Sequence, residues 1–303
     1  MTLRHTCTAC AGSCHGVRIR LVGDDAARAT QHARELGIDN PIVDGTLRLV
    51  DGVCVFQGPD GLCRIHTAFG GHLKPTVCRQ YPLVQLETES GPRIGIDPGC
   101  YTAVTSWKTG PEIGGGHGIG RRSTLDPAEV RAEAHILGCL EARPAVSTVA
   151  AVAAGVAPAD TLPPGLGERI LVHLRNPALR QLLAHDDAGP SARGALLPVL
   201  EHVMALDPRS PPPWPALTPE GEAWAVQCLQ RLLYLRLVER VPVIAVTMLG
   251  VVGAVACGWY ADSEEDFGRA MAGWVRAIRA PPFTRALLPS PAVLMWLATG
   301  REA

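Results

Sequence analysis

The chain has 303 residues, of which 47% are hydrophobic and 19% are charged, and its formal net charge is −1. This composition excludes a disordered polyelectrolyte and a globally basic nucleic-acid-binding protein, while the length allows two domains or one large one. The first hundred residues hold most of the cysteines, namely Cys7, Cys10, Cys14, Cys54, Cys63, Cys78 and Cys100. This third of the chain is therefore chemically distinct from the rest.

The first residues and the cysteine content bear on the cellular compartment of the protein. Residues 1–7 contain no apolar run of the kind that forms a secretory signal, which predicts a cytoplasmic protein. In a reducing cytosol, clustered cysteines are more often metal ligands or redox groups than disulfides. The uncharged segment 241–261 approaches the ~20 apolar residues that cross a bilayer, but Pro242 and three glycines interrupt it. We expect a buried helix there, no membrane partner and no nucleic-acid partner.

Short strands joined by loops are predicted in the first third. Residues 17–21 alternate apolar and polar side chains, and residues 83–88 and 92–96 flank Glu89-Ser90-Gly91, a plausible hairpin turn. Glycine and proline punctuate residues 97–120, which predicts loop rather than helix. A boundary is expected near Ser123.

Helices are predicted after that boundary. Asp126 is a good N-cap, Pro127 suits the first helical position, and the helix should end before Pro144. Further helices are expected over residues 166–174 and 196–206, and from residues 219 and 264 onward. The predicted fold class is α+β. A small cysteine-rich metal-binding module with short strands, residues 1–122, precedes a mainly α-helical region, residues 123–303.

The cysteine spacing predicts a metal site. Cys7 and Cys10 form a Cys-x-x-Cys pair that a turn can aim at one ion, and Cys14-His15 follows closely. The other four early cysteines recur beside turn-forming glycines and prolines, in loops that can carry ligands inward. The metal prediction covers Cys7, Cys10, Cys14, Cys54, Cys63, Cys78 and Cys100, with His5, His66, His72 and His117 nearby in sequence. Cys139, Cys228 and Cys257 are expected to be small buried hydrophobic residues.

These motifs resemble a known family. The matching elements are Cys7-x-x-Cys10-x-x-x-Cys14-His15, Cys54-x8-Cys63-Arg64-x-His66, Cys78-Arg79-x-Tyr81-Pro82 and Pro98-Gly99-Cys100. Over residues 5–120 the chain resembles the YkgJ-type cysteine-cluster family, described as zinc- or iron-chelating, and its relative, the flagellin lysine-N-methylase FliB. Two departures stand out: His15 replaces a second adjacent cysteine, and residues 101–111 look like an insertion.

The resemblance implies a function. It favours a cytoplasmic metalloprotein with an iron–sulfur cluster, of the 4Fe-4S type, over zinc, although thiolates suit both. Seven cysteines exceed the four thiolates of one such centre, so the ligand set stays open. One alternative is a protein lysine N-methyltransferase that uses S-adenosylmethionine and acts on a lysine-bearing protein. Another is a zinc-stapled protein-interaction module. The glycine-rich segment 112–118 lacks the preceding strand of a cofactor-binding turn, and no catalytic residue is assigned.

Overall fold

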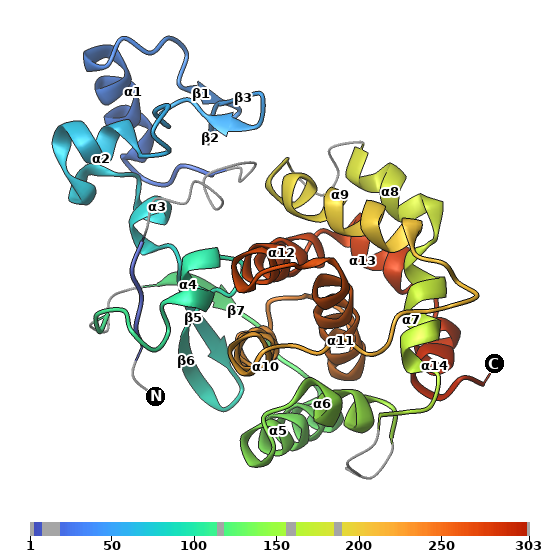
Figure 1. The fold of residues 1–303 in the computed structure, drawn as a ribbon. Helices are drawn as coiled ribbons and strands as arrows, with labels where there is room; N and C mark the ends of the chain where they lie inside the picture. The colour runs from blue at the N-terminus through green and yellow to red at the C-terminus, as the bar shows by residue number, and fades with distance from the viewer. Residues whose placement is uncertain (1–2, 8–18, 114–117, 156–161, 185–189, 302–303) are drawn as a thin grey trace.

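The computed structural model describes residues 3–7, 19–113, 118–155, 162–184 and 190–301. Within those residues the chain forms fourteen α-helices and three small sheets, which confirms the α+β class and its mainly helical composition (Figure 1). The helices dominate the second half of the chain, as predicted.

A small lobe comprises residues 19–80 and carries the blue and cyan elements in Figure 1. Its elements are α1 (Asp25–Glu35), β1 (Ile42–Val43), β2 (Thr46–Leu47), β3 (Leu49–Val50), β4 (Val53–Cys54), α2 (Arg64–Phe69), the 3-10 turn Gly71–Leu73 and α3 (Thr76–Gln80). Asp-Gly pairs at 44–45 and 51–52 turn the two hairpins, and all four residues have positive φ angles. This is the backbone that a two-residue hairpin turn requires. The prediction of short strands and loops is incomplete here, because it lacked α1, α2 and α3. The strand expected over residues 17–21 is wrong in its described part, where Arg20 forms only an isolated bridge to Thr46.

A three-stranded sheet follows the lobe. Strand β5 (Leu83–Thr88) pairs antiparallel with β6 (Gly91–Ile96), which confirms the predicted hairpin, and parallel with β7 (Ile119–Arg122). The prediction of continuous loop over residues 97–120 is wrong in two places, because α4 (Tyr101–Thr105) and the start of β7 lie there. Both elements are five residues or shorter, so their sequence pattern is weak and their partners are distant.

The helical region extends to the end of the described chain. Its elements are α5 (Pro127–Ala142), α6 (Val146–Ala153), α7 (Leu166–Leu174), α8 (Pro177–Ala184), α9 (Pro190–Ala205), α10 (Pro219–Tyr234), α11 (Val243–Tyr260), α12 (Glu264–Ala277), α13 (Pro281–Leu287) and α14 (Pro291–Thr299). The predicted cap is present, because the Asp126 carboxylate accepts the backbone N–H groups of Ala128 and Glu129. The helix expected from residue 196 begins earlier, at Pro190.

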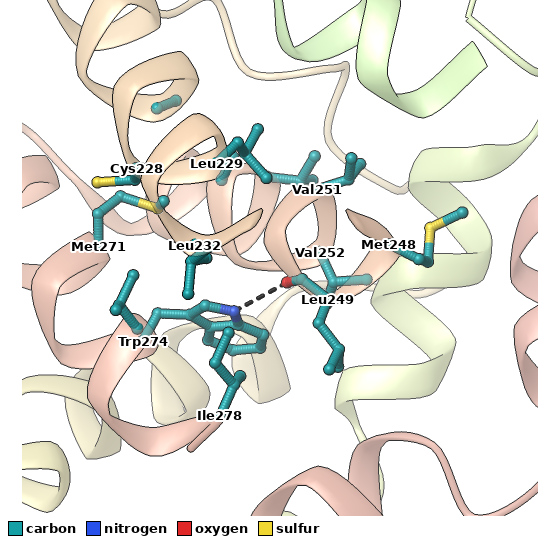
Figure 2. Close-up of a cluster of buried hydrophobic side chains, with 14 of the residues drawn as sticks. Cys228, Leu229, Leu232, Met248, Leu249, Val251, Val252, Met271, Trp274 and Ile278 are labelled. Atoms are coloured by element: carbon teal, nitrogen blue, oxygen red, sulfur yellow. Dashed lines mark hydrogen bonds between the residues drawn. The ribbon is translucent and has the colours of Figure 1, made fainter. Parts of the chain in front are cut away.

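Helix α11 lies at the centre of the helical core and contacts α6, α9, α10 and α12. Its middle is buried, and the indole N–H of Trp274 on α12 donates to the Leu249 carbonyl at 2.9 Å (Figure 2). Among the described residues it is the one helix long and apolar enough to cross a membrane, but most of it is covered by other helices. The predicted buried helix is confirmed.

An ion network joins the sheet to the helices. The Arg236 guanidinium contacts Glu133 of α5 at 3.0 Å and Glu89 of the β5–β6 turn at 2.5 Å. Arg93 of β6 also reaches Glu133, at 2.9 Å. Leu235 packs against Gly95 of β6, where an added Cβ would lie 3.0 Å from it. The sheet therefore packs on the helical core, whereas the small lobe has a hydrophobic cluster of its own.

Candidate functional site

One large cavity collects the chemically notable side chains of the first third. Its volume is about 1240 Å³, and segments of the small lobe, the sheet and the helical region all line it. Five cysteines predicted as metal ligands face this cavity: Cys7, Cys54, Cys63, Cys78 and Cys100. The other two, Cys10 and Cys14, lie with His15 outside the described residues. The structure thus brings to one place thiols that are up to 93 positions apart in the chain (100 − 7).

A tight loop sets Cys54 beside Cys63. Cys54 ends β4, and its carbonyl accepts the Gln57 N–H at 2.8 Å. The Gly58 N–H then donates to the Leu62 carbonyl at 2.8 Å, which returns the chain to Cys63 just before α2. Burial raises the pKa of the Cys54 thiol, and the neighbouring Cys63 raises it further. A bound cation would supply the positive charge that favours the thiolates.

The helical region holds the turn that carries Cys100. Asp97 accepts the Gly99 N–H at 2.7 Å, and its other carboxylate oxygen accepts from Arg279 at 2.7 Å. Arg276 of α12 donates to the Gly99 carbonyl. Burial works against ionisation of Asp97, but the charge and hydrogen bonds of Arg279 outweigh it and lower the pKa of this carboxyl. Cys100 is buried at the start of α4, with its sulfur 3.3 Å from the Thr102 hydroxyl.

His5 adds an imidazole to the same cavity. Its Nδ1 atom is buried and has no hydrogen-bond partner among the described residues. Burial lowers the pKa of His5, and the charge of Arg231 lowers it further, so the ring is neutral near neutral pH. A neutral imidazole nitrogen without a partner is the form that binds a metal ion. The cavity lining therefore offers one unpartnered imidazole nitrogen beside the thiols.

The described residues do not complete a coordination sphere. Within them, no group of three or more His, Cys, Asp or Glu side chains lies close enough to hold a metal ion. Thiolate sulfurs that bind one zinc ion each lie about 2.3 Å from it. Cysteines that line the same cavity do not by that fact meet this requirement. The structure places five of the predicted ligands on one cavity and leaves their convergence on a metal as a prediction.

The three later cysteines lie outside the cavity. Cys228 and Cys257 are fully buried in the helical core, and burial raises the pKa of Cys228 to about 12 and that of Cys257 further still. These two thiols behave as the buried hydrophobic residues that were expected. Cys139 is half-buried on α5, 3.9 Å from the His135 ring.

The glycine-rich segment 112–118 is only partly described. Residues 114–117, which include His117, lie outside the described residues. Before them come α4 and a turn rather than a buried strand, and Glu112 pairs with Arg4 at 2.6 Å. A Rossmann-type turn would need the strand to come first.

The sequence did not predict that residues of the helical region line the cavity. Arg240, Arg279 and Arg285 reach the cavity from the second half of the chain, where no motif announces them. A lone arginine carries no spacing signal, so only the tertiary structure could bring these residues to the thiols. Scans against family models, curated proteins and solved structures found no match to this chain. Function is therefore inferred from the cavity and its side chains.

Proposed function

We propose that this is a cytoplasmic metalloprotein of the YkgJ type that binds an iron–sulfur cluster, or zinc, through its clustered cysteines. The observation that carries the proposal is that five thiols from separate segments line one cavity. A 4Fe-4S cluster or a tetrahedral zinc takes four thiolates. Cys10 and Cys14 lie outside the described residues but stand three and seven positions after Cys7, a spacing that predicts further thiolate ligands.

The surroundings of the thiols support the same proposal. Lys74 and Arg79 flank Cys78 in sequence and line the cavity, where their charge offsets that of thiolates. The cluster of buried hydrophobic side chains in the small lobe consists of Ala29, Ala33, Leu47, Phe56 and Ile65. A core of that size stabilises a lobe weakly, and metal ligation supplies the missing cross-links.

Metal analysis of protein purified without oxygen tests the proposal. Iron, zinc and acid-labile sulfide are measured with an ultraviolet–visible spectrum, on the parent and on Cys63→Ser. The matched control is Cys139→Ser, a half-buried thiol outside the cavity. We expect iron with sulfide and a broad visible absorbance that Cys63→Ser loses and Cys139→Ser keeps. Zinc without sulfide would leave the metal site but exclude the cluster, and neither metal in the parent would overturn the proposal.

The size of the cavity favours a second candidate, the methyltransferase. At about 1240 Å³ the cavity exceeds the 300–1,000 Å³ of typical small-molecule sites, so an organic cofactor has room beside a metal. Calorimetric titration of the metal-loaded protein with S-adenosylmethionine tests this candidate. Saturable binding would support the methyltransferase, for which a lysine-bearing protein is the expected substrate. Colourless, zinc-containing protein without such binding would instead support the zinc-stapled interaction module.

A further inference from the structure

The cavity carries more positive charge than its acids balance. Its charged lining consists of Lys74, Arg79, Arg121, Arg240, Arg279 and Arg285 against Asp97 and Glu239. Both acids are already paired within the lining, Asp97 with Arg279 and Glu239 with Arg121 at 2.7 Å. The other four cations have no ion-pair partner among the described residues. The whole chain has a net charge of −1, so this excess is a local property of the cavity.

Two of these cations come from elements that carry none of the predicted metal ligands. Lys74 and Arg79 flank Cys78, whereas Arg240 lies between α10 and α11 and Arg285 lies on α13. Both arginines are exposed, and neither side chain makes a hydrogen bond or ion pair with the rest of the described chain. Arg240 also adopts a left-handed backbone with φ of 59°. That conformation is uncommon for a non-glycine residue and is found disproportionately at functional sites.

The wall beside the two arginines is apolar. Leu237, Val238 and Val241 come from the same segment as Arg240, and Pro281 comes from the same helix as Arg285. A guanidinium can donate two parallel hydrogen bonds to two oxygen atoms of one carboxylate, phosphate or sulfonate group. An apolar wall next to it accepts the hydrocarbon part of the same molecule.

We propose that the cavity binds a small amphiphilic organic anion. Arg240 and Arg285 hold its acidic group, and Leu237, Val238 and Val241 cover its apolar body. This inference goes beyond the proposed function, because it rests on residues of the helical region and holds for either metal.

A pair of fluorescent probes tests the site on the full-length protein as purified, with its metal. Anilinonaphthalene sulfonate carries an apolar body and one acidic group, and phenylnaphthylamine has a similar body without the charge. We expect saturable binding of the sulfonate, tighter than that of the uncharged probe and weakened by salt. Decanoate should displace the sulfonate, and decanol should displace it far less.

Charge removal identifies the residues. Arg240→Gln and Arg285→Gln should each weaken sulfonate binding about tenfold and leave phenylnaphthylamine binding unchanged, since each substitution removes a charge-assisted hydrogen bond to the acidic group. The control is Arg209→Gln, an exposed arginine outside the cavity, which should bind both probes as the parent does. Absence of saturable sulfonate binding, or unchanged binding by the double variant Arg240→Gln/Arg285→Gln, would overturn the proposal. Thermal melting of each variant shows that it is folded.

Metal content, measured on the same samples, separates this proposal from the previous one. A protein without metal that still discriminates between the probes would refute the metalloprotein and leave the anion site. A protein that holds its cluster but binds both probes equally would refute the anion site and leave the metalloprotein.

Discussion

At the residue scale, one buried ion network joins the β5–β6 hairpin to the helical core. Glu133 and Arg236 are almost wholly buried, and Glu133 receives two arginines, Arg93 and Arg236. Burial disfavours the Glu133 carboxylate, but the hydrogen bonds and charges of both arginines outweigh it and lower its pKa. The Arg236 guanidinium likewise lowers the pKa of Glu89 to about 2. These contacts hold the β5–β6 hairpin on the helical core, while Arg276 and Arg279 hold the turn before Cys100.

Removing one partner of that network should be costly. Glu133→Gln removes the carboxylate that Arg93 and Arg236 share and leaves Arg236 with Glu89 alone, and we expect it to lower the free energy of unfolding by about 3 kcal/mol. The control is Glu201→Gln, which breaks an exposed pair with Arg180 and should cost less than about 1 kcal/mol. Urea unfolding at neutral pH measures both. Equal effects of the two substitutions would contradict the role given to the network.

The same network predicts a pH dependence. Because the folded-state pKa of Glu133 lies below its unfolded value, its stabilisation is complete above about pH 5 and is lost as pH falls through the folded pKa. Glu89 acts in the same direction, down to about pH 2. We expect the free energy of unfolding to drop between pH 5 and 3 in the parent and to drop less in Glu133→Gln. Parallel curves for the two proteins would show that Glu133 is not responsible.

At the element scale, the packing of α11 and α12 sets the helical core. Gly253 of α11 lies against Trp274, and an added Cβ would meet the indole ring at 2.3 Å. The indole cannot move freely, since it is fully buried and bonded to Leu249. Glycine here permits two helices to approach closely, at the expense of helix propensity.

Two glycine substitutions should therefore have opposite signs. Gly253→Ala places a methyl group inside the Trp274 ring position and should destabilise the protein by about 1–3 kcal/mol. Gly138→Ala on α5 has open space around the new Cβ and should stabilise by roughly 0.5–1 kcal/mol through helix propensity. Thermal or urea unfolding gives both values. A stabilising Gly253→Ala would show that α11 and α12 are less closely packed than described.

At the scale of the whole molecule, the small lobe and the helical region have separate hydrophobic clusters of very different size. If metal ligation cross-links the lobe, its removal should open the lobe and spare the helices. We expect hydrogen exchange to rise across residues 19–80 after treatment with a chelator, while α10, α11 and α12 stay protected. Equal exchange in the lobe with and without metal would mean that the lobe is stable on its own.

The sequence by itself determined the local features. Asp126, Thr218 and Ser263 each cap the helix that was expected after them, because capping depends on a few adjacent residues. The hairpin around Glu89-Ser90-Gly91 and the buried apolar helix α11 also follow from short-range pattern. The α+β class and the concentration of cysteines in the first third were readable in the same way.

Only the tertiary structure decided what lies beside the thiols. The parallel pairing of β7 with β5, the Arg236–Glu133 network and the approach of Arg240, Arg279 and Arg285 to the cysteine-lined cavity all join residues at least 30 positions apart. Such contacts leave no periodic trace, since each depends on how whole elements pack. The cysteine spacing could therefore predict a metal-binding chemistry, while the cavity, its charge and its apolar wall could emerge only from the folded chain.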